Sequence, residues 1–175
     1  MIRFLITLIL SLMVFLLIGQ SVGTSELDEI NGNWAGTLTY TDYRDDSSQS
    51  TLECKMESKW KGNNGRLTFL FTEPNGKVIK DKTKIKLRKN GTKVIFDGKY
   101  KVTEFNSYDN QKRWKLKLET KGKDNKRTAK IWLVIELERN SFEIIKMVQY
   151  QGTDHSFERN RYFFEREGDR MQESN

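Results

Sequence analysis

The sequence predicts an all-β chain whose strands form an antiparallel up-and-down β-barrel of about 8–10 strands. Three observations support this fold class. Almost no helical pattern follows the first 23 residues, turn-forming clusters of Gly, Asn, Asp and Ser recur about every 8–12 residues, and apolar residues alternate with polar ones between the clusters. The short connections exclude parallel crossovers, which need about a dozen residues each. Such strands can form a sandwich or a barrel, and we favour the barrel because closure leaves no exposed edge.

The first 23 residues have the layout of a secretory signal. Arg3 precedes a mostly apolar run that ends at Ile18. Small or polar residues follow, so we expect cleavage after Ser21 or Gly23. The run is short for a membrane span, which needs about 20 residues, and an uncleaved anchor is the alternative. The chain then divides into a signal peptide at 1–23, a barrel domain at 24–168 and a polar tail at 169–175.

Ten strands are expected in the barrel domain, joined by short turns. Asn-Gly pairs mark two turns, in PNGK at 74–77 and KNGT at 89–92, because both central residues can adopt positive φ there. The segment RNS at 139–141 is a similarly tight connection. The expected strands are 33–43, 50–61, 66–73, 77–88, 92–97, 99–106, 112–121, 128–139, 141–151 and 156–166.

Three of these strands show the alternation most clearly. In LECKMESKW, residues 52–60, Leu52, Cys54 and Met56 alternate with charged residues. The segments RWKLKLET (113–120) and TAKIWLVIELER (128–139) alternate in the same way. A period of two with one apolar face indicates strands that are buried on one side only.

The segment KVIKDKTKIKLRK, residues 77–89, decides which side of the barrel faces water. Alternation alone also fits an outer-membrane barrel, in which polar residues face the lumen. Crowded cations in a lumen would repel one another, whereas on an outer surface water hydrates them and salt screens them within about 8–10 Å. We therefore predict a soluble barrel with a basic outer surface and no transmembrane span in the mature chain. The cations that share this surface are Lys80, Lys82, Lys84, Lys86 and Arg88.

The first expected strand opens with Gly32 and Trp34, a G-x-W that resembles the calycin group of lipocalins and fatty-acid-binding-like barrels. The resemblance implies a closed barrel in which Trp34 lies at the base under an arginine from the last strand. Arg161 and Arg166 are the candidates, and a cation on an aromatic face contributes about 0.5–2 kcal/mol. The usual lipocalin disulfide and C-terminal helix are not evident, so a lipocalin-like or fatty-acid-binding-like barrel fits better than a true lipocalin. The stretch WAGTLTYTDY is also similar to uncharacterised exported bacterial proteins.

The inward faces are expected to carry aromatic residues and methionine. Such residues line pockets for apolar ligands, and they also fill solid cores, so both interpretations stay open. The residues that we expect to line a pocket are Tyr40, Met56, Phe69, Phe71, Tyr100 and Trp114.

Three polar residues interrupt otherwise apolar faces, namely Asp81, Thr83 and Glu104. A buried polar group without a partner costs about 1–3 kcal/mol. Each residue therefore marks either a spot that binds a ligand headgroup or a β-bulge that turns the side chain outward, and we favour the bulge.

No residue pattern indicates catalysis, so we expect a protein that is not an enzyme and needs no cofactor or metal. Cys54 alternates with apolar neighbours and is expected to be a buried, inert thiol. His155, the only histidine, could bind haem as a histidine does in nitrobindin-like barrels, which also begin with a G-x-W-x-G like that of residues 32–36. We favour the alternative, a histidine in a loop.

Two functions fit these features. The first is an exported lipocalin-like barrel that binds a small apolar or amphiphilic molecule. The second is a non-catalytic interaction module whose basic exterior, within a net charge of +7, contacts an anionic surface or protein. Export argues against a nucleic-acid partner. Because Cys54 is the only cysteine, the chain has no intramolecular disulfide, which fits a secreted or periplasmic bacterial protein.

Overall fold

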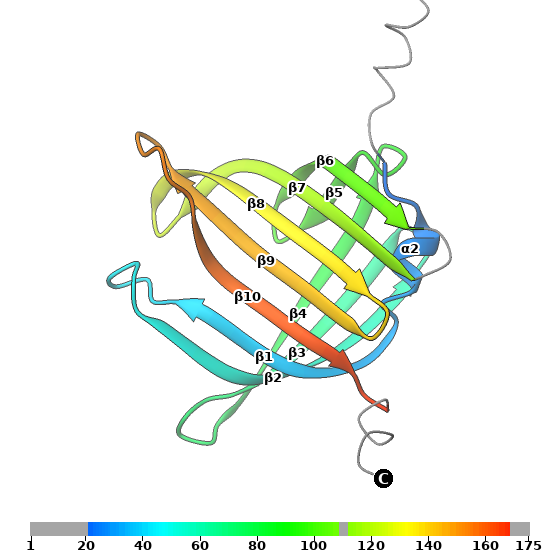
Figure 1. Cartoon of the computed structure of the whole chain (residues 1–175), viewed down its shortest axis with the longest axis horizontal. Coiled ribbons are helices and arrows are strands. Elements are labelled where there is room, and N and C mark those ends of the chain that lie inside the picture. Colours follow the sequence, from blue (N-terminus) through cyan, green and yellow to red (C-terminus); the bar gives the residue numbers. More distant parts are fainter. Residues whose placement is uncertain (1–20, 109–111, 169–175) are drawn as a thin grey trace, which may run out of the picture.

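The computed structural model describes residues 21–108 and 112–168. It is a closed barrel of ten antiparallel strands in which each strand pairs with its neighbours in sequence (Figure 1). This confirms the expected fold class. The strands are β1 (Gly32–Thr41), β2 (Gln49–Lys61), β3 (Asn64–Thr72), β4 (Val78–Arg88), β5 (Lys93–Phe96), β6 (Lys99–Tyr108), β7 (Arg113–Asp124), β8 (Arg127–Glu138), β9 (Ser141–Tyr150) and β10 (Phe157–Arg166).

The first and last strands close the barrel, which excludes the sandwich. β1 pairs with β10 from Trp34 opposite Arg166 to Tyr40 opposite Asn160. Gly36 permits this close approach, because a Cβ atom at that position would come 1.9 Å from the carbonyl oxygen of Phe163. The second glycine of the G-x-W-x-G opening is therefore a closure residue.

Every expected strand is present, with ends within three residues of the expected ones. One element was not expected: a short helix, α2 (Thr24–Asp28), precedes β1. Five residues are too few to show a helical period, and packing of the buried Leu27 stabilises the helix instead. Residues 1–20 of the expected signal peptide and the expected tail at 169–175 lie outside the described residues.

The alternation of the sequence becomes the inside and outside of the barrel. Along β8, Ala129, Ile131, Leu133, Ile135 and Leu137 are all buried, and the residues between them are partly exposed. The expected apolar faces of β2 and β7 are buried in the same way. The core therefore lies inside the barrel.

The two ends of the barrel differ. Residues 21–31 cover one end, which we call the base: Val22, Leu27 and Ile30 are buried there, and the Val22 amide donates to the Gly91 carbonyl at 3.2 Å. The opposite end, which we call the mouth, carries the loops 42–48, 73–77, 125–126 and 151–156. In Figure 1, α2 lies at the right-hand end and these loops lie toward the left.

Candidate ligand-binding site

Trp34 lies at the base with an arginine on its ring. The Arg166 guanidinium carbon is 4.2 Å from the ring centroid, and this side chain also donates to the carbonyl oxygens of Asn31 and Glu29 at 2.8 and 2.7 Å. The Trp34 indole donates to the Ile30 carbonyl at 3.0 Å. The last strand thus fastens the N-terminal cover to the barrel through Arg166, in the arrangement that the resemblance implied.

Arg161, the other candidate, lies elsewhere. Its guanidinium pairs with Glu143 at 2.5 Å and with Glu158 at 2.7 Å, and 42% of its side chain is exposed. The position of Arg161 is opposite Ile145 on β9, in the phase that faces outward, so it cannot reach Trp34.

Gly32, the remaining residue expected at the base, adopts φ +127° at the entry to β1.

The half of the interior next to the base is filled. The space left among its side chains is about 10 Å³, which is at or below the volume that one water molecule needs. Trp114 lies in this half, and its ring is 6.5 Å from that of Phe142, which also contacts Trp34. Met56, opposite Trp34, is 2% exposed. These two expected pocket residues therefore belong to a packed core.

The middle of the interior holds an aromatic cluster of Phe69, Phe71, Tyr162 and Phe164. The Phe69 ring centroid lies 4.9 Å from that of Tyr162 and 6.1 Å from that of Phe71. Phe164 is fully buried, whereas Phe71 and Tyr162 are half-buried. Burial also raises the pKa of the Tyr162 hydroxyl. The cluster thus runs from the packed core toward the mouth.

Inward-facing apolar residues near the mouth are incompletely covered. Leu52, Phe71 and Ile79 are half-buried although each continues the inward phase of its strand. Tyr40 is likewise half-buried near the end of β1. Tyr100 of β6 differs from these residues, because it is only 7% exposed and burial raises its pKa to about 12, so it belongs to the packed core. Solvent therefore reaches apolar side chains of the inner face at the mouth and does not reach those at the base.

The three polar residues on apolar faces have two different explanations. A bulge between Val102 and Glu104 shifts the register of β6, so Glu104 lies opposite Lys117 on the outer surface. β4 has no such bulge, and Asp81 and Thr83 stay in phase with the buried Ile85. The bulge interpretation is right for Glu104 and wrong for Asp81 and Thr83, whose positions face inward at the mouth half.

One side of the mouth is closed by a buried ionic network that the sequence analysis missed. Arg159 is 0% exposed, and its Nε donates to Asp124 at 3.0 Å while its Nη2 donates to Asp46 at 2.6 Å and to the Tyr150 hydroxyl at 2.7 Å. Lys146 donates to the second oxygen of Asp124 at 2.7 Å. Two cations thus face two carboxylates, which compensates their desolvation.

Burial alone would raise the pKa of the Asp124 carboxyl, but hydrogen bonds and charges from Lys146 and Arg159 outweigh it and hold the pKa below its usual value.

Two of the four charged residues of this network could have been recognised from the sequence. Asp124 is in phase with Leu118, and Lys146 is in phase with Ile144, so both are charges on inward faces. Arg159 had none, because it enters the interior at a bulge between Glu158 and Asn160.

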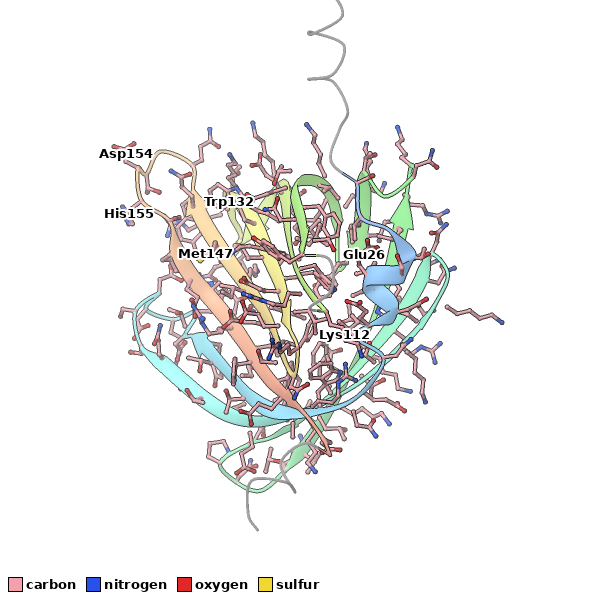
Figure 2. The ribbon with its side chains drawn as sticks, turned by 45° about the vertical axis from the view of Figure 1, so that its right-hand side comes forward. Glu26, Lys112, Trp132, Met147, Asp154 and His155 are labelled. Atoms are coloured by element: carbon pink, nitrogen blue, oxygen red, sulfur yellow. The ribbon has the colours of Figure 1, made fainter. Side chains whose placement is uncertain are left out.

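The remaining singled-out residues contribute no reactive group to the interior. Burial raises the pKa of the Cys54 thiol to about 12, so it is protonated at neutral pH and unreactive. His155 is exposed beside Asp154 in the loop between β9 and β10, at the left of Figure 2. Among residues 21–108 and 112–168, no group of three or more His, Cys, Asp or Glu side chains could hold a metal ion.

The five expected basic residues all project from the outer face of β4. Lys80, Lys82, Lys84 and Arg88 are exposed and Lys86 is half-buried, whereas Ile85 and Leu87 between them are buried. The outer surface of the barrel is not uniform: on the opposite side, Trp132 of β8 lies next to Met147 of β9 (Figure 2).

The sequence matches no protein-family model, and no curated protein is similar to it. No helix within the described part of the chain is long and apolar enough to cross a membrane. The likeness to known proteins therefore lies in the architecture: the chain is a closed, all-antiparallel ten-strand barrel, which is consistent with a calycin-like fold.

Proposed function

We propose that the chain is an exported, non-catalytic, lipocalin-like barrel that binds a small apolar or amphiphilic molecule in the mouth half of its interior. The observation that carries this proposal is the gradient of burial along the inner face. Side chains at the base are packed without space for a ligand, whereas Leu52, Phe71 and Ile79 at the mouth are apolar and partly open to solvent. Apolar walls with a few polar groups are typical of small-molecule sites.

The inner face also contains charges that a polar headgroup would meet. Asp81 is exposed at an inward-facing position, and the Lys146 side chain is 21% exposed while bound to Asp124. An amphiphilic ligand would place its apolar part against Phe71 and Tyr162 and its polar part toward these charges and the solvent. Export, into the periplasm or out of the cell, is supported by the signal-like residues 1–23.

Native mass spectrometry of the chain purified after export tests the proposal. We expect a mass excess that disappears on denaturation, and a processed N-terminus in the region of residues 21–23. Binding of the extracted molecule, or of an anilinonaphthalene sulfonate dye in its absence, is then titrated against variants.

Phe71→Ala removes an inward ring and is expected to weaken binding about tenfold, which corresponds to about 1.4 kcal/mol of lost apolar contact. Phe163→Ala is the matched control, because this phenylalanine is 42% exposed on the outer face of β10. Equal binding by the two variants, or a native mass equal to that of the bare chain together with no dye binding, would contradict the proposal.

A further inference from the structure

The outer surface of β2 to β5 carries a dense set of cations, which we call the basic face. Its members are Lys59, Lys61, Arg66, Lys80, Lys82, Lys84, Lys86, Arg88 and Lys93. Within the described residues, Lys59 is the only one of these cations that forms an ion pair, with Glu57 at 2.5 Å. Glu57 also lies within electrostatic reach of Lys80, and the remaining cations form no ion pair in the described part of the chain.

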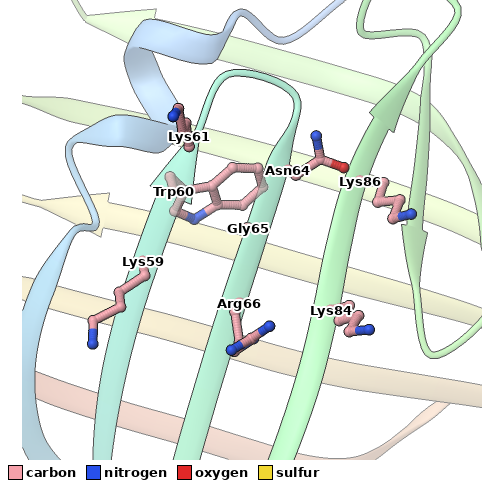
Figure 3. A pocket seen from close by; sticks show the side chains of 8 residues that line it. All are labelled: Lys59, Trp60, Lys61, Asn64, Gly65, Arg66, Lys84 and Lys86. Atoms are coloured by element: carbon pink, nitrogen blue, oxygen red, sulfur yellow. The ribbon is translucent and has the colours of Figure 1, made fainter.

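Strand register places like charges directly opposite each other on this face. Lys59 of β2, Arg66 of β3 and Lys84 of β4 form one row across three strands, which Figure 3 shows. Arg88 also lies opposite Lys93. Directly opposed like charges destabilise a sheet, so folding alone does not favour this arrangement.

The other side of the barrel shows that the chain can pair its charges across strands. On β7 and β8, Arg113 lies opposite Glu138 and bonds to it at 2.7 Å, and Lys115 lies opposite Glu136 at 3.2 Å. On the basic face, by contrast, Arg66 and Lys84 lie opposite each other and neither forms an ion pair within the described residues, and such a surface complements an anionic partner.

The basic face contains a hollow of about 360 Å³ between β2, β3 and β4 (Figure 3). Gly65 and Trp60, neither of which carries a charge, also line the hollow. A Cβ atom at Gly65 would come 2.4 Å from the buried Trp60 ring, so glycine at this position leaves room for the ring. The cations around the hollow are Lys59, Lys61, Arg66, Lys84 and Lys86. Five cations around these uncharged residues fit a phosphate-bearing group.

Exposed aliphatic side chains lie on the same surface, toward the mouth. Leu70 of β3 is 37% exposed and Val78 of β4 is 59% exposed, and both are in the outward phase. The large exposed apolar side chains of these two strands include no aromatic ring on which a nucleic-acid base could stack. Cations combined with exposed aliphatic groups are instead suited to the border between lipid headgroups and acyl chains.

We propose that the basic face is a docking surface for a membrane that contains anionic phospholipids. The lysine and arginine side chains contact headgroup phosphates, one of which occupies the hollow, and Leu70 and Val78 contact the outer part of the acyl region. The attraction depends on ionic strength, because exposed charges are screened by salt.

Vesicle sedimentation tests the proposal with phosphatidylcholine vesicles, with and without phosphatidylglycerol. We compare the ratio of binding to vesicles with and without phosphatidylglycerol. The apolar run at 4–18 contributes equally to both, so its contribution cancels in this ratio. We expect a strong preference for anionic vesicles, and a decrease of about 25-fold in the Lys82→Gln/Lys84→Gln variant, or about fivefold for each lysine near the surface. These substitutions relieve like-charge contacts, so the melting temperature should stay the same or rise.

The matched control is Lys121→Gln/Lys123→Gln, which removes the same charge from the outer surface of β7 and is expected to keep the preference. An equal decrease in both variants would mean that only net charge matters, and the proposal would fail. It would also fail if anionic vesicles were not preferred.

A second variant separates lipid from a soluble polyanion. Leu70→Ser/Val78→Ser should weaken vesicle binding and leave heparin retention unchanged. If this variant binds vesicles as the parent does, and heparin is bound as tightly as vesicles, the partner is a polyanion and the lipid assignment is wrong. Phe71→Ala should dock normally, so loss of the interior ligand and loss of docking are distinguishable.

Discussion

Replacing Arg159 by leucine removes the central cation of the network at the mouth. The guanidinium has no contact with solvent, and it donates to Asp124, to Asp46, to the Tyr150 hydroxyl and to the Thr41 carbonyl. Leucine fills part of the volume but donates no hydrogen bond. Asp124, whose side chain is 1% exposed, would then keep only Lys146 as a cationic partner.

The expected cost is set by the carboxylate left behind. Removing one partner from a buried ion pair destabilises a protein by about 3–5 kcal/mol, because the other charge remains desolvated. For a chain of this size that corresponds to a decrease of roughly 6–20 °C in melting temperature, at about 2–4 °C per kcal/mol. This is a large fraction of the 5–15 kcal/mol that is typical of a folded domain.

Urea unfolding followed by tryptophan fluorescence measures the change, because Trp34 and Trp114 are buried. Arg161→Leu is a matched control: the same residue type on the same strand pairs with two carboxylates, but 42% of its side chain is exposed. Exposed pairs contribute about 0–1 kcal/mol. If the two variants lose the same free energy of unfolding, burial does not strengthen the network and the reasoning is refuted.

The same network predicts a pH dependence. The pKa of Asp124 is lower in the folded chain than the value of about 3.9 expected when unfolded, so the unfolded state binds the proton first. The stabilisation by Asp124 is therefore complete above about pH 5 and is lost as the pH falls through the folded-state pKa. Urea midpoints measured from neutral to acid pH should fall less steeply in Asp124→Asn than in the parent, and parallel curves would contradict this assignment.

Three further predictions concern the base and the core. Arg166→Met should destabilise the chain by about 2–4 kcal/mol, because it removes two hydrogen bonds and a cation–π contact with Trp34. Thermal melts of the parent, of Arg166→Met and of Arg166→Lys, which keeps the charge, measure this loss of stability. Equal stability of the parent and the Met variant would disprove the fastening role. Cys54, with a pKa of about 12 and 2% exposure, should react with a thiol reagent only after denaturation, so rapid labelling of the folded chain would show the burial to be wrong. A chain that begins at Ser21 should be about 1–3 kcal/mol more stable in urea than one that begins at Thr24, because Val22 is buried and its amide donates to the Gly91 carbonyl; identical midpoints would exclude that contribution.

Local pattern was sufficient for the strands and for their faces. Alternation along β2, β7 and β8 gave the buried set, and Asn-Gly turns located two hairpins, because both features depend on near neighbours in the chain. The sequence also indicated Trp34 and Arg166 at the base, through the resemblance, and the basic surface of β4. It did not show α2, whose five residues fold only against the base.

By itself, then, the sequence determined ten half-buried strands, their order and the sign of the charge on their outer surface. The tertiary structure alone decided which inward residues are packed and which are open to solvent, since that depends on how far each lies from the base. It also decided that Arg159 turns inward at a bulge to meet Asp124, and that Lys59, Arg66 and Lys84 stand in one row. Bulges and register are set by pairing between strands, and this information is not contained in the period of any single strand.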